Sequence, residues 1–224
     1  MYKMCRTNIQ SGRSMIEMLG VLAIIGVLSV GGIAGYSKAM MKYRINKTIE
    51  QISQIVANTR ILYTNHTTYE GLNNKTAIQM GIIPDELGTD YHSGNLTNSL
   101  GGNVFIGAGN ISSNYPPLNT AFLIGISKLS REACINIATH DYGTSSSSGI
   151  IGIQTTKDTG TFYGRVDKFM NITAIHIGCE GLTQDGRSVA CSESSTSKLP
   201  MNVAQAAKGC NCQKDTCTIT WKYH

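Results

Sequence analysis

The sequence of 224 residues contains little charge, few aromatic side chains and only four prolines. Charged residues make up 15%, below the usual quarter, and the net charge of +5 is spread along the chain. Aromatic residues make up 7%, too few for a surface that stacks on bases. We therefore expect no nucleic-acid partner, although the length is sufficient for one large domain or two small ones.

The shortage of charge is concentrated in one segment, because no charged residue occurs from Met18 to Tyr36. A helix of these residues would span about 28 Å, close to the thickness of the hydrocarbon layer of a bilayer. The helical pattern continues beyond Tyr36, and the first proline is Pro84. The sequence therefore predicts one long helix whose first half is apolar enough to lie in a membrane.

The segment before the apolar run is short and basic, with Lys3, Arg6 and no acid in residues 1–12. Ordinary signal cleavage after Ala34 would release a soluble chain. Glu17 disfavours this interpretation, because it adjoins the apolar run, where a carboxylate costs about 2.5–3.5 kcal/mol at a helix centre and less near an end. A cation from a neighbouring chain would stabilise Glu17, which makes it a candidate for assembly.

The start of the chain resembles the prepilin signature of type IV pilins and pseudopilins. The resemblance depends on Gly12, on Glu17 as the fifth residue after it, and on the apolar helix that follows. It implies that a membrane-embedded prepilin peptidase cuts after Gly12 and methylates the new amino group on Arg13. It also implies that Glu17 is the acid required for assembly. Arg13 stands where the family more often has Phe, Met or Leu.

These features predict three parts: residues 1–12 as a leader peptide, 13–66 as a membrane and assembly helix, and 67–224 as a globular head. In the second half of the helix, positions spaced three or four apart predict one face that packs on the head. These positions are Ile45, Ile49, Ile52, Val56, Thr59 and Tyr63. The glycines at 31, 32 and 35 predict local unwinding when subunits pack, or alternatively a close contact between helices.

The head combines polar loops with short apolar segments. The expected strands are 104–106, 121–126, 150–154, 162–166 and 217–223. Alternation in the last of these predicts one buried and one wet face. Short helices are expected over 75–80, 130–138 and 202–208. This order of elements is similar to that of the larger type IVb pilins, which implies an α+β fold: a long helix packed on an antiparallel sheet, with a disulfide-stapled C-terminal region.

Seven cysteines are present, and removal of the leader would take Cys5 away. The six that remain are Cys134, Cys179, Cys191, Cys210, Cys212 and Cys217. An even number in an exported domain favours disulfides, whose pairing the sequence alone leaves open. The family resemblance implies a disulfide from Cys134 to either Cys179 or Cys210. An alternative is a thiolate metal site at Cys210, Cys212 and Cys217, with His224 nearby. An oxidising compartment disfavours thiolates, so we expect no metal or cofactor.

The sequence shows no catalytic pattern. The five histidines lack metal or catalytic spacing, and neither a nucleophile elbow nor a phosphate-binding loop is present. They are His66, His92, His140, His176 and His224. We therefore expect a structural protein and not an enzyme.

The expected function is that of a type IV pilus subunit, stored in the bacterial inner membrane and polymerised into a homo-oligomeric filament outside the cell. The prepilin peptidase and the pilus assembly machinery would be its partners. A minor pilin or a type II secretion pseudopilin would have the same N-terminal chemistry. The alternative of another class is a secreted binding module or enzyme released by cleavage after Ala34.

Overall fold

The structure is a computed structural model that describes residues 15–109, 119–143, 148–157, 188–191, 198–212 and 216–224. The chain divides into two compact units, Met1–Lys42 and Tyr43–His224. The division falls within helix α1 (Met15–Tyr63), earlier than the expected start of the head at residue 67. The second part of α1 groups with the head because it supplies part of the buried core. The two units are described separately below.

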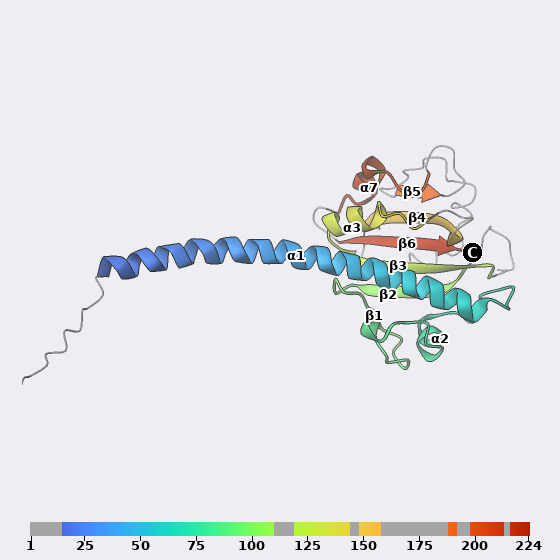
Figure 1. The fold of residues 1–224 in the computed structure, drawn as a ribbon. Coiled ribbons are helices and arrows are strands. Elements are labelled where there is room, and N and C mark those ends of the chain that lie inside the picture. The colour runs from blue at the N-terminus through green and yellow to red at the C-terminus, as the bar shows by residue number, and fades with distance from the viewer. Residues whose placement is uncertain (1–14, 110–118, 144–147, 158–187, 192–197, 213–215) are drawn as a thin grey trace, which may run out of the picture. The chain divides into compact units, whose positions relative to one another are not determined.

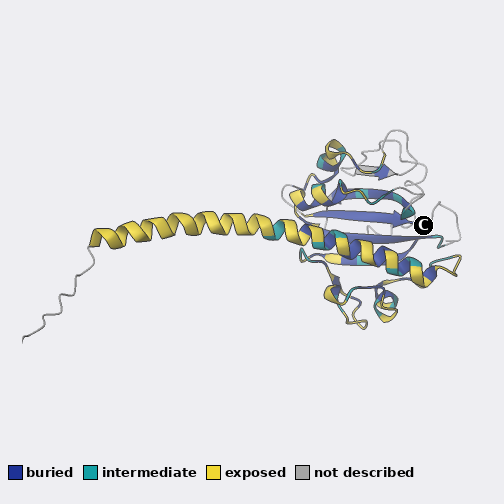
Figure 2. Ribbon diagram, viewed as in Figure 1, coloured by how far each residue is buried: buried dark blue, intermediate teal, exposed yellow. Residues whose placement is uncertain are grey.

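In the first unit, α1 is a regular helix from Met15 onward that continues through all three glycines of the 31–35 segment. Its residues 15–39 are exposed, and Figure 2 shows this part of the helix in yellow. The one acid in its first turn is Glu17.

The second unit is built on a sheet in which the described strands number six, all paired antiparallel. Their order across the sheet is β1-β2-β3-β6-β4-β5, so the last strand of the chain lies in the middle (Figure 1). The strands are β1 (Leu96–Thr97), β2 (Asn103–Gly109), β3 (Ala121–Leu129), β4 (Ile150–Lys157), β5 (Ser188–Cys191) and β6 (Cys217–Tyr223). Four of the five expected strands are confirmed, and the segment 162–166 lies outside the described residues.

The second part of α1 presents a buried stripe, as its spacing predicts. The buried residues are Ile45, Thr48, Gln51, Ile52, Ile55, Val56, Thr59 and Tyr63. The stripe is wider than expected: Thr48, Gln51 and Ile55 belong to it, whereas Ile49 is only partly buried. Two of the added residues are polar, and each finds a hydrogen-bond partner, Thr48 on Arg44 O at 2.9 Å and Gln51 on Glu86 at 3.1 Å.

Three short helices form where the sequence favours them, each with a side-chain cap. Helix α2 (Asn74–Gln79) has a capping box, in which Asn73 accepts from Thr76 N. Helix α3 (Arg131–Ala138) is capped by Ser130, and helix α7 (Val203–Gly209) by Asn202. An N-cap oxygen satisfies one of the free backbone N–H groups of the first turn. A 3₁₀ turn, η1 (Asp85–Leu87), follows Pro84.

A single buried side chain organises the connection between α1 and β2. Asn74 donates through Nδ2 to Gly94 O at 2.9 Å and to Val104 O at 3.1 Å. Its Oδ1 accepts from Ile106 N at 2.8 Å. All three contacts are to backbone groups, so the first residue of α2 holds the loop before β1 against β2.

The expected wet face of β6 is wrong, because all seven residues of this strand are buried. The polar set Thr218, Thr220 and Lys222 has exposed fractions of only 5% or less. A central strand has neighbours along both edges, and short threonine side chains between them leave little surface for water. The alternation therefore predicted correctly which residues share a face of β6, but it wrongly predicted that one of the faces is exposed to solvent.

Lys222 is the most unusual of these buried residues. It pairs with Leu123 of β3 on one side and with Gly152 of β4 on the other. Its exposed fraction is 0%, and its Nζ has no hydrogen-bond partner in the part of the chain that the structure describes. Burial lowers the pKa of the Lys222 ammonium to about 8, because the charged form loses its water.

We expect Lys222→Met to stabilise the head at pH 7, by about 1–4 kcal/mol, because a buried ammonium without a partner is replaced by an apolar chain of similar length. The folded pKa lies below the unfolded value of 10.5, so the unfolded state binds more protons between about pH 8 and pH 10.5. The wild-type free energy of unfolding should thus rise over this range relative to that of the variant. Thermal unfolding of the detergent-solubilised chain at pH 7 and pH 10 measures both effects. Lys75→Met, at an exposed position, is the control, and an equal gain from it would contradict the explanation.

Candidate assembly helix and disulfide cluster

Of the residues expected to direct processing and assembly, the structure describes one. Gly12 and Arg13 lie outside the described residues. Glu17 lies in the first turn of α1, where the free N–H groups and the helix dipole favour a negative charge. Its side chain is exposed, and so are the apolar residues that follow it.

The first part of α1 exposes an almost uninterrupted apolar surface. An 18-residue window has a mean hydropathy of 2.2, and none of it is buried in this chain. The large exposed side chains are Met15, Ile16, Met18, Leu19, Val21, Leu22, Ile24, Ile25, Val27, Leu28, Val30, Ile33 and Tyr36. Each costs about 1.5–3 kcal/mol in water relative to an apolar environment. The helix is long and apolar enough to cross a membrane.

Beyond their own helix, the glycines of this segment contact nothing among the residues that the structure describes. A methyl group added at Gly31, Gly32 or Gly35 would have no heavy atom within 4 Å. Packing inside the subunit therefore does not require glycine at these positions. The expected unwinding or close helix contact concerns packed subunits and stays a prediction.

A polar clasp, formed by Lys47, Gln51, Glu86 and Ser99, fixes the start of the buried part of α1. Lys47 Nζ lies 3.1 Å from Glu86 Oε2. Gln51 Nε2 donates to the same oxygen, and Ser99 Oγ donates to Gln51 Oε1 at 3.1 Å. The Lys47 hydrogen bond lowers the pKa of Glu86, and the same bond raises the pKa of Lys47. The clasp thus joins α1 to η1 and to the turn after β1.

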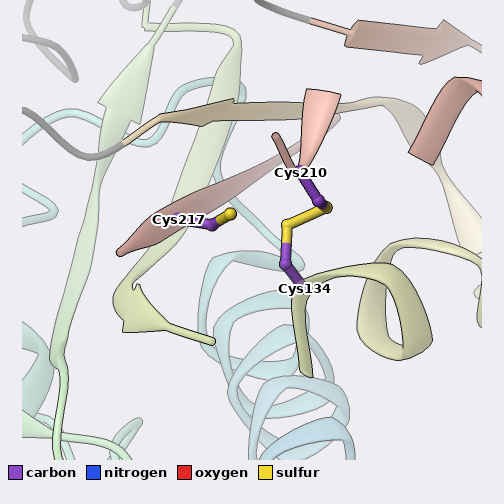
Figure 3. Close-up of side chains that lie close together, drawn as sticks. All are labelled: Cys134, Cys210 and Cys217. Carbon is purple, nitrogen blue, oxygen red and sulfur yellow. A yellow bond between two sulfur atoms is a disulfide. The ribbon is translucent and has the colours of Figure 1, made fainter. Parts of the chain in front are cut away.

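Four cysteines meet where α3, α7 and β6 come together. A disulfide joins Cys134 of α3 to Cys210 at the end of α7, so of the two partners considered for Cys134 the structure has Cys210. A second disulfide joins Cys212 to Cys217, the first residue of β6. The Sγ atoms of Cys134, Cys210 and Cys217 lie within 4.8 Å of one another (Figure 3). Cys179 lies outside the described residues, and Cys191 ends β5.

The two disulfides differ in how much chain they close. Cys134 and Cys210 are 76 residues apart, and Cys212 and Cys217 are five apart. Loop-closure entropy gives the long loop about 4–5 kcal/mol and the short loop about 2 kcal/mol. The Cys134–Cys210 bond is therefore the main covalent staple of the head, and the expected disulfide-stapled C-terminal region is confirmed.

The alternative of a thiolate metal site is wrong for these cysteines. Cys210, Cys212 and Cys217 are all in disulfides, so none offers a thiolate. His224 follows the far end of β6, seven residues from Cys217. The sequence did not predict the Cys212–Cys217 pair, although two cysteines so close before a strand are a usable signal.

The histidines that the structure describes lie apart from one another. His66 packs near Tyr63, His92 near Tyr91, and His140 near Tyr142. His224 is exposed and follows β6. His176 lies outside the described residues. The described histidines therefore pack as single side chains against tyrosine rings or at the surface.

Comparison with known proteins finds similarity to pilus subunits. Two proteins named "Major structural subunit of bundle-forming pilus", from Escherichia coli O111:H- and E. coli O127:H6 (strain E2348/69 / EPEC), are similar to this chain. Each is 26% identical over 175 residues, which is 77% of this chain and 86% of the relative.

Two solved structures are also similar. A type IV b pilin from Salmonella typhi has a TM-score of 0.46 and 19% identity, over 80% of this chain and 99% of its own. TcpA, a type IV pilin from Vibrio cholerae El Tor biotype, has a TM-score of 0.47 and 17% identity, over 81% and 99%.

The family model described as PilS N terminal matches residues 42–223. This range begins at the boundary of the second unit and covers nearly all of it. The match extends over well more than half of the chain. The chain therefore belongs to the PilS N-terminal family, and the type IV pilin expected from its sequence is confirmed.

Proposed function

We propose that this chain is the structural subunit of a type IV pilus, anchored by the first part of α1 and polymerised through that helix into an extracellular filament. The observation that carries the proposal is a fully exposed apolar helix, with one acid in its first turn, that continues into a disulfide-stapled head. The bundle-forming pilus subunits support the same role.

The apolar part of α1 needs an environment other than water, and two are available to a pilus subunit. Before assembly, the bilayer of the inner membrane covers the exposed side chains. In the filament, the same side chains of neighbouring copies cover one another. A single surface thus serves for storage and for polymerisation, and the move from one to the other keeps the apolar area out of water.

Processing creates the partner for Glu17. Cleavage after Gly12 by a prepilin peptidase gives Arg13 a free amino group, and methylation keeps that group cationic. Within an apolar bundle, Glu17 of one subunit is stabilised by this cation of the next. Because each subunit carries one acid in the first turn of α1 and one N-terminal amino group, the pair sets the axial register of neighbouring helices.

We expect Glu17→Gln to give a processed, membrane-held subunit that does not assemble. The amide keeps the shape of the side chain but removes the charge that pairs with the neighbouring amino group. Electron microscopy of cells and immunoblotting of sheared filaments measure assembly, and membrane fractionation measures the subunit pool. Glu70→Gln, at an exposed position in the head, is the control. Normal filaments from Glu17→Gln would show that register does not depend on this charge.

Intact-mass measurement of the mature protein tests the processing step. We expect a chain that begins at Arg13, with an added methyl group on its amino nitrogen. A chain that begins at Gly35 would instead support a secreted binding module or enzyme, because that cut removes most of the apolar helix. The same measurement on a Gly12→Ala variant should give the unprocessed mass. Processing of that variant after residue 12 would contradict the role of the glycine.

A further inference from the structure

The disulfide cluster contains more cysteines than a single stabilising disulfide requires. Their arrangement permits thiol–disulfide exchange. Cys134 and Cys210 are bonded, and Cys217 Sγ lies within 4.8 Å of both sulfurs although it is bonded to Cys212. Figure 3 shows the Cys217 sulfur directed from β6 toward the bond between the other two. Cys212 is not part of this close set.

The four cysteines differ in access to solvent. Cys134, Cys210 and Cys217 each have an exposed fraction of 0%, and Cys212 has 4%. Asn211, the residue before Cys212, and Thr216, the residue before Cys217, are both exposed. Cys212 is therefore the member of the set that has some exposed surface, and its sulfur is where we expect an external thiol to attack. Access of this kind decides which sulfur of a disulfide is attacked.

We propose that these four cysteines form a thiol–disulfide exchange site, in which Cys212 takes up an external thiol and Cys217 exchanges with the Cys134–Cys210 disulfide. The substrate class is a small thiol, or a protein dithiol, present where the head is exposed. This inference concerns the head alone and does not depend on polymerisation.

The exchange balances in two steps. The thiolate of the external thiol attacks the Cys212 sulfur, a mixed disulfide forms there, and the Cys212–Cys217 bond breaks to release the Cys217 thiolate. Cys217 then attacks the sulfur of Cys210 or Cys134, and the bond between those two breaks. The displaced thiolate takes a proton from water. Each step forms one disulfide and breaks one, so no oxidant is needed.

The second step is favoured by proximity. The attacking sulfur is already beside its target, so the step needs no encounter between separate molecules. Its product ties α3 or the end of α7 directly to β6, in place of the bond between α3 and α7. The head therefore keeps one buried disulfide in this region after the Cys212–Cys217 bond has been attacked.

Two matched variants test the proposal, because each removes the same disulfide but leaves a different sulfur. Cys212→Ser leaves the Cys217 thiol beside the Cys134–Cys210 bond, and Cys217→Ser leaves the Cys212 thiol instead. The full chain is exported, extracted in detergent, alkylated at low pH and digested without reduction, and its disulfides are mapped by mass spectrometry. We expect Cys134–Cys217 or Cys210–Cys217 peptides beside the native pair in Cys212→Ser. In Cys217→Ser we expect the native pair without Cys134–Cys212 or Cys210–Cys212 peptides.

A native pair alone in both folded variants would overturn the proposal. Equal thermal unfolding of the two variants shows that a difference in pairing does not come from a difference in folding. The wild-type protein provides a second test that needs no substitution, with reduced glutathione as the probe and N-ethylmaleimide as the quench. We expect the glutathione adduct on Cys212 together with a new disulfide to Cys217. An adduct on Cys134 or Cys210, or an unchanged Cys134–Cys210 pair with Cys217 alkylated, would contradict the mechanism.

Discussion

The head depends on one constraint: its last strand occupies the middle of the sheet. β6 pairs with β3 along one edge and with β4 along the other, and these are among the most extensive pairings of the structure. β3 and β4 precede β6 in sequence and do not pair with each other, so they join one sheet only through the C-terminal residues. Such non-local pairing costs loop entropy before it contributes contacts. The features that fix β6 in place therefore determine whether β1-β2-β3 and β4-β5 form one sheet.

Both ends of β6 are fixed, by different chemistry. At its start, Cys217 lies in the disulfide cluster. At its end, the Tyr223 ring stacks on Phe122 and lies beneath the Arg60 guanidinium, 5.5 Å from the ring centre. The backbone then continues to His224, whose N–H donates to Gly149 O at 2.9 Å. Gly149 has a positive φ of 56°, and a Cβ at this position would lie 2.8 Å from His224 O, so a side chain here would be both strained and crowded by backbone.

Features that depend on neighbours along the chain were predictable from the sequence, and those decided by distant contacts were not. The caps at Ser130 and Asn202 and the helical stripe from Ile45 to Tyr63 follow from local rules. Lys222 does not, because alternation assigns it to a wet face and only the central position of β6 buries it. Gln51 is similar: its burial depends on Glu86 and Ser99, which lie 35 and 48 residues further along the chain.

The same distinction applies to the candidate site. Gly12 and Glu17 were found by their spacing in a short segment, whereas which cysteines join depends on where α3, α7 and β6 meet. The Cys134–Cys210 bond closes the longer of the two loops, so it restricts the unfolded chain more than the Cys212–Cys217 bond does. The short Cys212–Cys217 bond adds less stability and is nearer to solvent. In a head with both bonds, the Cys212–Cys217 disulfide can be opened while the Cys134–Cys210 disulfide is retained. Alternatively, the Cys134–Cys210 disulfide is exchanged for another disulfide within the cluster.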